Sequence, residues 1–578
     1  MKRYEVREEI SEKAAEGLQG LPPLLARLLF HRGIKMAEEA EKFLNPDYEK
    51  HIHNPFLLKG MAQAVERMVK AAENKERIVV WSDYDADGIP GAVALHDFFK
   101  KIGYENFENY IPDRHDEGFG LNAEGIEGIA KRGAKLLITV DCGIADAKEI
   151  EYAHSLGVDV IITDHHLPNG EFPRASAVIN PKQEGCDYPD KNLCGAGVAF
   201  KLVQALCSIL RSDLKISEAI FPIGWEKWLL DMVGLATFSD MVPLTGENRV
   251  LAHYGLKVLR KSPRAGLREL LLRLKISQKN LTEDDVSFMI TPRINAASRM
   301  GKPMDAFKLL STKDDLEAGM YAEHLNKIND ERKGRVAAIV KEAKKIMSER
   351  LVSAQKEVIV LGNPLWRPSL LGLVANALAE DHGRPVFLWG REGGSKIKGS
   401  CRSSGDVNLI TLMEAARGAF VEFGGHHSSG GFTVAEEKIH FLAEELLCAY
   451  KKIQSVKDSA AEPLWVDARF SLDDVNDENY SVVEKLAPFG TGNPKPVFLF
   501  ENLRVAEIGR FGRDKNHLSL VFNKSNGGEV SAISFFMSPD GFGREIKAGD
   551  TINLVATLEK SFYRHPPVLR LRVVDILQ

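Results

Sequence analysis

The stretch Ile78-Val-Val-Trp81-Ser-Asp83-Tyr-Asp85-Ala-Asp87-Gly88 decides the fold, because three carboxylates directly follow an apolar run. The run that ends at Trp81 predicts a buried strand. Side chains two residues apart in an extended chain share a face, so Asp83, Asp85 and Asp87 are expected to point the same way. Three carboxylates on one face repel one another strongly unless a cation neutralises them.

Strand and helix alternate on both sides of this stretch. Apolar runs predict further strands at Leu136–Val140 and Val158–Thr163. Helical periodicity or a favourable N-terminal proline predicts helices at Pro90–Phe99, Ala123–Arg132 and Ala145–Ser155. Such alternation favours right-handed βαβ units and a parallel sheet. We therefore predict a parallel-sheet α/β catalytic domain over residues 51–310.

Three more polar segments follow in order, namely Asp141-Cys-Gly143, Asp164-His165-His166 and Ser239-Asp240. The first two come directly after predicted strands, and open α/β sheets bind ligands at that edge. Taken alone, the aspartates at 83–87 also suit a solvated turn or a helix cap. A calcium loop is excluded, because its position 12 is Ala94.

Together, the four segments predict a site for hard divalent ions. Carboxylates with one or two histidines favour Mn²⁺ or Mg²⁺ over metals that prefer thiolates. Two such ions about 3.5–4 Å apart can activate water and stabilise a leaving oxygen. Hydrolysis of a phosphodiester is the reaction that most needs this arrangement.

The rest of the chain divides by pattern into further units. Residues 1–50 predict a lead-in of short helices, 311–352 one or two long connector helices, 353–455 a second α/β domain, and 463–578 a small β-barrel. A polar linker is expected at 455–463.

Composition limits the classes of function. The net charge is only −5, so a nucleic-acid surface must be local, and a wholly basic protein is excluded. The six cysteines form no C-x-x-C pair, which argues against a zinc ribbon and suits reduced thiols in the cytoplasm. No signal-like segment or apolar run of about 18 residues is present, so no membrane association is expected.

Further motifs carry a resemblance over nearly the whole chain. They are Val178–Gln183, Cys194–Gly197, Gly234–Leu244, Gly246–Arg249, Pro292–Ala297, Phe423–His426, Pro488–Gly490 and Gly492–Pro494. With them the chain resembles the DHH phosphoesterases, and within them the bacterial exonucleases specific for single-stranded DNA. The resemblance implies that the second lobe is a DHHA1 domain and that the barrel is of the OB type.

The resemblance also implies a ligand set for two metal ions. Asp141 would bridge both ions. One site would be completed by Asp83 and Asp85, and the other by Asp87, His165 and Asp240. His166 would contact the scissile phosphate or help the leaving group, and Asp164 would orient the histidines. Many relatives have a histidine where Trp81 stands, so Asp83 would take its place; which of Asp83 and Asp85 binds which ion stays open.

Seven residues are implied to bind substrate. They are Arg114, Arg299, Ser400, Arg402, Gly424, Gly425 and His426. The planar fork of arginine suits phosphate, although a surface salt bridge is the alternative for each arginine alone. The segment 424–426 also suits a tight turn with a helper histidine.

The implied activity is 5′→3′ degradation of single-stranded DNA to 5′-mononucleotides, in DNA repair and recombination. The two lobes and the barrel would form a clamp too narrow for duplex. A single-strand-binding protein and a RecQ-type helicase are the implied partners, and the layout suits a monomer. The alternatives are a phosphodiesterase for short oligonucleotides or cyclic dinucleotides, and an inactive scaffold that only binds single strands.

Overall fold

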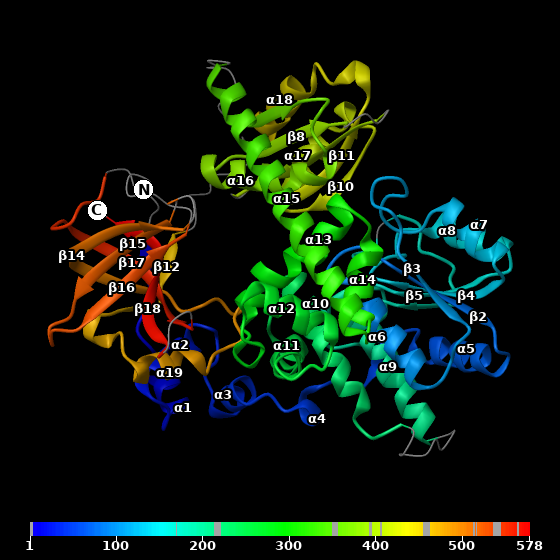
Figure 1. Ribbon diagram of the computed structural model, residues 1–578, viewed down its shortest axis with the longest axis horizontal. Helices are drawn as coiled ribbons and strands as arrows, with labels where there is room; N and C mark the ends of the chain where they lie inside the picture. Colours follow the sequence, from blue (N-terminus) through cyan, green and yellow to red (C-terminus); the bar gives the residue numbers. More distant parts are fainter. Residues whose placement is uncertain are drawn as a thin grey trace.

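The computed structural model places three sheet-bearing lobes around a central group of helices (Figure 1). It describes residues 4–168, 170–212, 221–349, 357–391, 396–404, 407–454, 463–512, 515, 517–535, 545–562 and 566–577. The predicted polar linker at 455–463 lies almost wholly outside the described residues.

The catalytic lobe is built on a five-stranded, fully parallel sheet of order β3-β2-β4-β5-β6. Its strands are β2 (Arg77–Ser82), β3 (Phe107–Tyr110), β4 (Ala134–Val140), β5 (Asp159–Thr163) and β6 (Ala177–Ile179). Its helices are α5 (Met61–Glu73), α6 (Gly88–Lys101), α7 (Ala123–Lys131), α8 (Ala147–Ser155) and α9 (Gly195–Ser212). The parallel sheet predicted from the sequence is confirmed.

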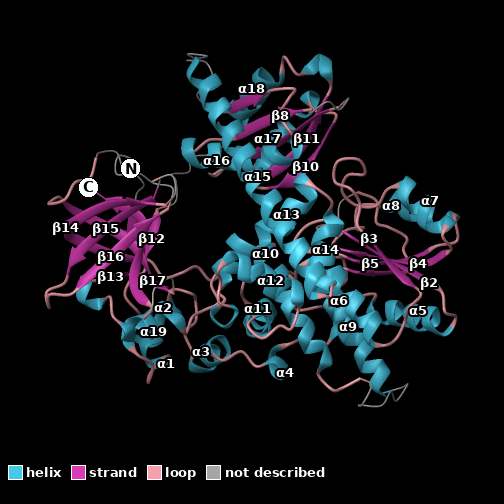
Figure 2. Ribbon diagram, viewed as in Figure 1, coloured by secondary structure: helices cyan, strands magenta, loops and turns pink. Residues whose placement is uncertain are grey.

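Both faces of this sheet are covered, as Figure 2 shows. On β2, Ile78 and Val80 pack into the core that includes α5, α6 and α9. Val79 and Trp81 pack on the other face, where α7 and α8 lie. Alternate residues of the strand therefore serve two cores, which explains why its sequence is continuously apolar.

A group of helices connects this sheet to the second lobe. It consists of α10 (Leu230–Ser239), α11 (Gly246–Leu259), α12 (Ala265–Leu274), α13 (Thr291–Met300) and α14 (Pro303–Ser311). The predicted connector is a single helix of 35 residues, α15 (Asp315–Glu349). Its C-terminal half, including Ile339 and Ala343, packs in the core of the second lobe.

The second lobe has a five-stranded sheet of order β10-β11-β9-β8-β7, in which only β7 and β8 are parallel. Its elements are β7 (Ile359–Gly362), α16 (Pro368–His382), β8 (Val386–Gly390), β9 (Ile397–Arg402), α17 (Leu409–Ala415), β10 (Glu422–His426), β11 (Ser429–Val434) and α18 (Leu442–Gln454).

The C-terminal lobe is a closed barrel, because β14 pairs with both β15 and β17 while β18 pairs with both β16 and β17. Its elements are β12 (Leu464–Val466), β13 (Ala468–Arg469), α19 (Asp477–Glu484), β14 (Phe498–Phe511), β15 (His517–Asn523), β16 (Glu529–Ser534), β17 (Thr551–Ser561) and β18 (Val568–Leu577). Register shifts at Phe500/Leu503 and Val505/Glu507 bend β14 so that it can serve both sides.

Most of the first fifty residues pack with the barrel, whereas Tyr48 is buried in the core of the catalytic lobe. Besides the expected short helices α1 (Glu12–Gly17), α2 (Pro23–Phe30), α3 (Ala37–Leu44) and α4 (Tyr48–His51), they form a strand, β1 (Tyr4–Val6). This strand pairs in parallel with β12. Leu25, Leu28 and Leu29 share a core with the barrel interior. The two ends of the chain therefore make one body.

Arg249 on α11 joins three parts of the chain. Its side chain is buried, donates through Nε to the carbonyl of Phe43 at 2.6 Å, and lies 3.5 Å over the Phe43 ring. Its Nη2 donates to the carbonyls of Leu486 and Ala487, at 3.1 and 3.2 Å. Arg249 of the catalytic lobe therefore contacts both the N-terminal segment, at Phe43, and the segment that leads from α19 into β14, at Leu486 and Ala487.

Replacing Arg249 by alanine is expected to loosen this junction, because buried carbonyls lose their donor. The cost is about 2 kcal/mol, equal to roughly 30-fold faster amide exchange. Hydrogen exchange of residues 484–497, measured by mass spectrometry, checks this locally without assuming two-state unfolding. Arg268→Ala, which removes an exposed ion pair with Asp315, is the matched control. Equal exchange in the two variants would contradict the assignment.

Candidate metal centre

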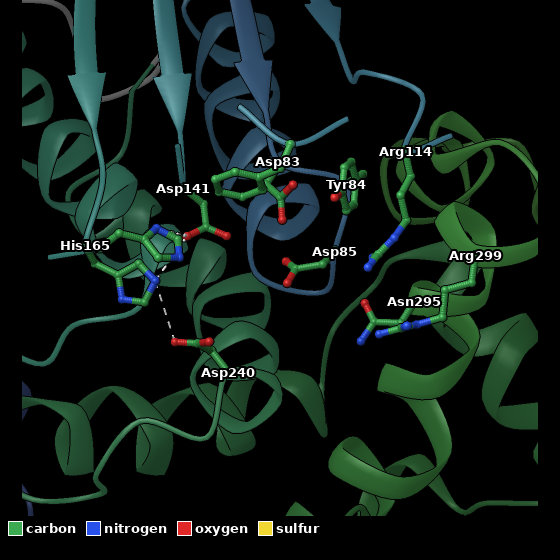
Figure 3. A pocket seen from close by; sticks show the side chains of 11 residues that line it. Asp83, Tyr84, Asp85, Arg114, Asp141, His165, Asp240, Asn295 and Arg299 are labelled. Atoms are coloured by element: carbon green, nitrogen blue, oxygen red, sulfur yellow. Dashed lines mark ion pairs between the residues drawn. The ribbon is translucent and has the colours of Figure 1, made fainter. Parts of the chain in front are cut away.

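The polar segments meet at the carboxyl edge of the parallel sheet (Figure 3). Asp83 follows β2, Asp141 follows β4, and His165 follows β5 by two residues. Asp240 is the C-cap of α10 and approaches from the helical side. The topology therefore gathers residues from distant points of the chain, as the sequence predicts.

Potential ligand atoms form three groups in which all atoms lie within 4.8 Å of one another. The groups are Asp83, Asp85 and Asp141; Asp87, His165 and Asp240; and Asp141, His165 and His166. Nε2 of His165 is 3.1 Å from Asp141, 3.7 Å from Asp87 and 3.8 Å from Asp240. All six predicted ligands are thus brought together, and Asp141 of the first group also lies 3.1 Å from His165 of the second.

Helix N-termini hold two of these carboxylates. Oδ1 of Asp85 accepts from the amides of Asp87 and Gly88, at 2.7 and 3.1 Å. Asp87 accepts from the amides of Gly195 and Ala196, at 2.6 and 2.7 Å, where α9 begins. Unpaired amides at a helix start attract negative charge, so these hydrogen bonds orient both carboxylates.

The protein itself compensates the negative charge of this centre poorly. Burial, together with the neighbouring carboxylates, raises the pKa of Asp83 and Asp141 well above the usual range. The same causes raise the pKa of Asp87 to about 7 and that of Asp240 to about 8. Buried oxygens of Asp83 and Asp141 accept no hydrogen bond within the described part of the chain. Hard divalent cations fit this set, because they would supply the missing positive charge.

The two adjacent histidines have opposite character. Burial, with repulsion from His166, lowers the pKa of His165 to about 3, so its ring is neutral and can ligate. Burial also opposes the charge on His166, but the hydrogen bond from Nδ1 to Asp164, 2.8 Å long, outweighs it and raises the pKa to about 9. His166 therefore bears a proton at neutral pH.

Asp164 lies behind the histidines and belongs to none of the three groups. Its Oδ1 accepts from the amides of His165 and His166 and from the His166 ring, while Oδ2 accepts from the amide of Ile144 at 2.9 Å. These bonds keep its pKa below the usual range despite burial. Its geometry is that of a positioning residue, which is the role expected for it.

Two predicted arginines line the same cavity of about 270 Å³. Arg114 lies 4.9 Å over the ring of Tyr84. Arg299, on α13, donates through Nη1 to the carbonyl of Ser369 at 2.7 Å. Their guanidinium groups lie on the same side of the pocket, next to Asp85 and opposite His165 (Figure 3). The pocket thus combines an acidic half with a basic half.

The predicted residues of the second lobe share one sheet face, with one exception. Ser400 is opposite Gly431, which is opposite Gly424, and Arg402 is opposite Ser429, which is opposite His426. These two rows are two residues apart, so they point the same way, while Gly425 points to the other face. Burial and the positive neighbours His166 and Lys182 lower the pKa of His426, which places it within electrostatic range of the metal centre.

Sequence reasoning missed three residues that line the pocket, Tyr84, Phe119 and Asn295. Asn295 accepts from the amide of Ala86 at 2.9 Å and so fixes the loop between the first aspartates. It lies in the motif Pro292–Ala297, which was the available signal. Trp81 points away from the pocket and stacks on Tyr110 at 4.2 Å, so it is not a potential ligand.

Fold and site together define a DHH-type phosphoesterase, and family models agree. Residues 77–236 match the DHH family N-terminal domain, 307–452 the DHHA1 domain and 466–575 the RecJ OB domain.

Relatives narrow the class. Proteins named single-stranded-DNA-specific exonuclease RecJ are 34% identical over 92% of this chain in Bacillus subtilis, 31% over 89% in Haemophilus influenzae and 30% over 95% in Escherichia coli. The chain spans 66%, 89% and 94% of their respective lengths. The chain belongs to the RecJ family.

Solved structures agree with the fold and the kind of site. A crystal structure of RecJ in complex with Mn²⁺ from Thermus thermophilus matches with a TM-score of 0.80 and 25% identity, covering 100% of this chain and 79% of that one. A manganese-bound exonuclease RecJ matches with a TM-score of 0.58 and 31% identity, covering 70% of this chain and 97% of that one.

Proposed function

We propose that this chain is a metal-dependent exonuclease that degrades single-stranded DNA from the 5′ end and releases 5′-mononucleotides. The observation that carries the proposal is Asp141, which belongs to two of the three groups of potential ligands, in a pocket that also holds Arg114 and Arg299. The names of the relatives support the substrate and the reaction class. Mn²⁺ or Mg²⁺ is the cofactor that the donor set favours.

The proposed ligand roles follow the three groups. Asp83 and Asp85 would hold one ion, Asp87, His165 and Asp240 would hold the other, and Asp141 would be shared by the two sites. When bound, the two ions supply an activated water and neutralise the charge that develops on the leaving oxygen.

The protein's own groups do the rest. Protonated His166 lies 3.8 Å from Asp141 and can bind a phosphate oxygen or give a proton to the leaving oxygen. Asp164 orients the ring of His166 through the hydrogen bond that it accepts from Nδ1. Arg114 and Arg299, with Ser400 and Arg402 from the second lobe, bind the 5′-terminal phosphate. Gly424, Gly425 and His426 contact the nucleotide. With these roles, the pocket accommodates a 5′-terminal phosphate, so digestion begins at the 5′ end.

The cellular setting is also a proposal. We propose a monomer that acts in the cytoplasm with a single-strand-binding protein and a RecQ-type helicase, in repair and recombination. The tying of both chain ends into one body supports the monomer. All six cysteines are free thiols, which suits a reducing compartment. No described helix is both long and apolar enough to cross a membrane.

The test is digestion of a long single strand labelled at either end, with Mn²⁺ or Mg²⁺. Immediate release of a mononucleotide from the 5′-labelled strand, with slow loss of the 3′ label, is expected. A blunt duplex should be cleaved far more slowly, and a chelator should stop the reaction. Turnover of dinucleotides alone would favour the small-substrate enzyme, and tight binding without digestion would favour the scaffold.

A further inference from the structure

Arg332 lies on the connector helix α15. It makes no hydrogen bond or ion pair with any residue that the structure describes, and its buried Nε has no acceptor. Its side chain is only partly exposed, and burial lowers its pKa. A buried donor in a cationic group costs free energy unless something accepts from it, so an anion is expected here.

The position of Arg332 is set by the crossing of α15 and α13. Nε of Arg293 on α13 donates to Oδ1 of Asn326 on α15 at 3.1 Å, and Met300 and Val336 pack against the same hydrophobic cluster. Arg332 is one turn before Val336, and Arg299 directly precedes Met300. Arg332 is therefore near enough to Arg299 for their charges to repel, but it does not line the catalytic pocket.

The surroundings are strongly positive. Burial and the charges of Arg114, Arg332 and Arg402 together lower the pKa of Arg299 to about 9. Three guanidinium groups, drawn from both lobes, thus lie within electrostatic range of Arg299. Like charges gathered in this way raise the local concentration of a polyanion.

We propose that Arg332 is a positioning residue that binds an internal backbone phosphate of the single strand, just outside the catalytic pocket. The proposal rests on the proposed function and extends it along the strand. The 5′-terminal phosphate is assigned to the pocket itself, so Arg332 meets a later phosphate. Because α15 packs against both lobes, this contact would hold the strand against the element that joins them.

The test measures binding of a labelled single strand as a function of salt, in an Asp141→Asn background so that the strand is not digested. Each phosphate neutralised on a single strand contributes about 0.7 to the slope of log K against log salt. Arg332→Gln should lower the slope by about this amount and weaken binding about tenfold at low salt. Lys327→Gln, the same charge change at an exposed site on the same helix, is the control.

Two further arms sharpen the result. Arg332→Lys, which keeps the charge, should keep most of the slope, which separates a lost contact from a misfolded helix. A strand with a 5′-hydroxyl should show the same loss in Arg332→Gln. Equal slopes for Arg332→Gln and Lys327→Gln, or a loss that disappears with the 5′-hydroxyl strand, would overturn the proposal. Failure of the parent protein to bind single strands would instead overturn the proposed function.

Discussion

Asp141→Asn is expected to reduce digestion of single-stranded DNA by about 10³-fold or more. The side chain belongs to one ligand group and lies 3.1 Å from His165 of the other. The stabilisation that metal ions give a transition state is worth several kcal/mol, with each 1.36 kcal/mol equal to a factor of ten. Asparagine is the right replacement, because residue 141 has a φ of 62° and asparagine tolerates the left-handed region better than alanine does.

In the absence of metal, the same substitution is expected to stabilise the fold, although it reduces activity. The folded-state pKa of Asp141 is raised, so without metal its ionised form destabilises the fold at neutral pH. This cost grows as the pH rises above the unfolded value of about 4. Metal-free Asp141→Asn should therefore melt at a higher temperature than the metal-free parent at pH 7. Added Mn²⁺ should raise the melting temperature of the parent far more than that of the variant. A variant that remains active, or that melts lower without metal, would contradict the assignment.

Gly195→Ala is expected to disable the same centre without changing any ligand. A Cβ at this position would lie 2.4 Å from Cβ of Asp141 and 2.6 Å from its Cγ and Oδ1. The amide of Gly195 also holds Asp87 at 2.6 Å, so α9 cannot move away freely. Overpacking of this kind costs about 1–3 kcal/mol, and a misplacement of about 1 Å can cost roughly 10²-fold in rate.

Gly197→Ala is the matched control, two residues along the same helix. A Cβ there would meet Sγ of Cys194 at 3.5 Å and Cβ of Leu193 at 3.6 Å, which are ordinary contacts. Single-turnover rates and Mn²⁺ affinity, measured for both variants, separate the two outcomes. We expect Gly195→Ala to lose about 10²-fold in rate and to bind Mn²⁺ more weakly, and Gly197→Ala to stay near the parent. Equal effects would show that helix propensity, and not the approach to Asp141, is responsible.

The parts of the fold that follow from local pattern are predictable. β2, β4 and β5 are apolar runs buried on both faces, and the rule that parallel strands end at one edge places Asp83, Asp141 and His165 together. β3 could not be predicted from an apolar run, because two of its four residues are polar and it lies at the edge of the sheet. β14 could not be predicted from alternating apolar and polar residues, because two register shifts interrupt that pattern.

The parts of the site that depend on long-range packing are not predictable in this way. Asn295 reaches the loop at Ala86 across more than two hundred residues of chain. Arg332 stands on a charged, periodic helix, where a solvated side chain is the natural expectation; only the crossing of α13 and α15 places it within electrostatic range of Arg299. Which ion each carboxylate binds stays a prediction.

The pairing of β1 with β12 has a consequence for how the molecule is made. During synthesis β1 leaves the ribosome well before its partner strand, because Leu464 follows it by more than 450 residues. The catalytic lobe can assemble early, since domains generally fold in order from the N-terminus. Until the barrel forms, Leu25, Leu28 and Leu29 remain exposed to solvent. A nascent or truncated chain that stops before the barrel would expose this apolar face, so the barrel also protects the N-terminal helices that precede the catalytic lobe.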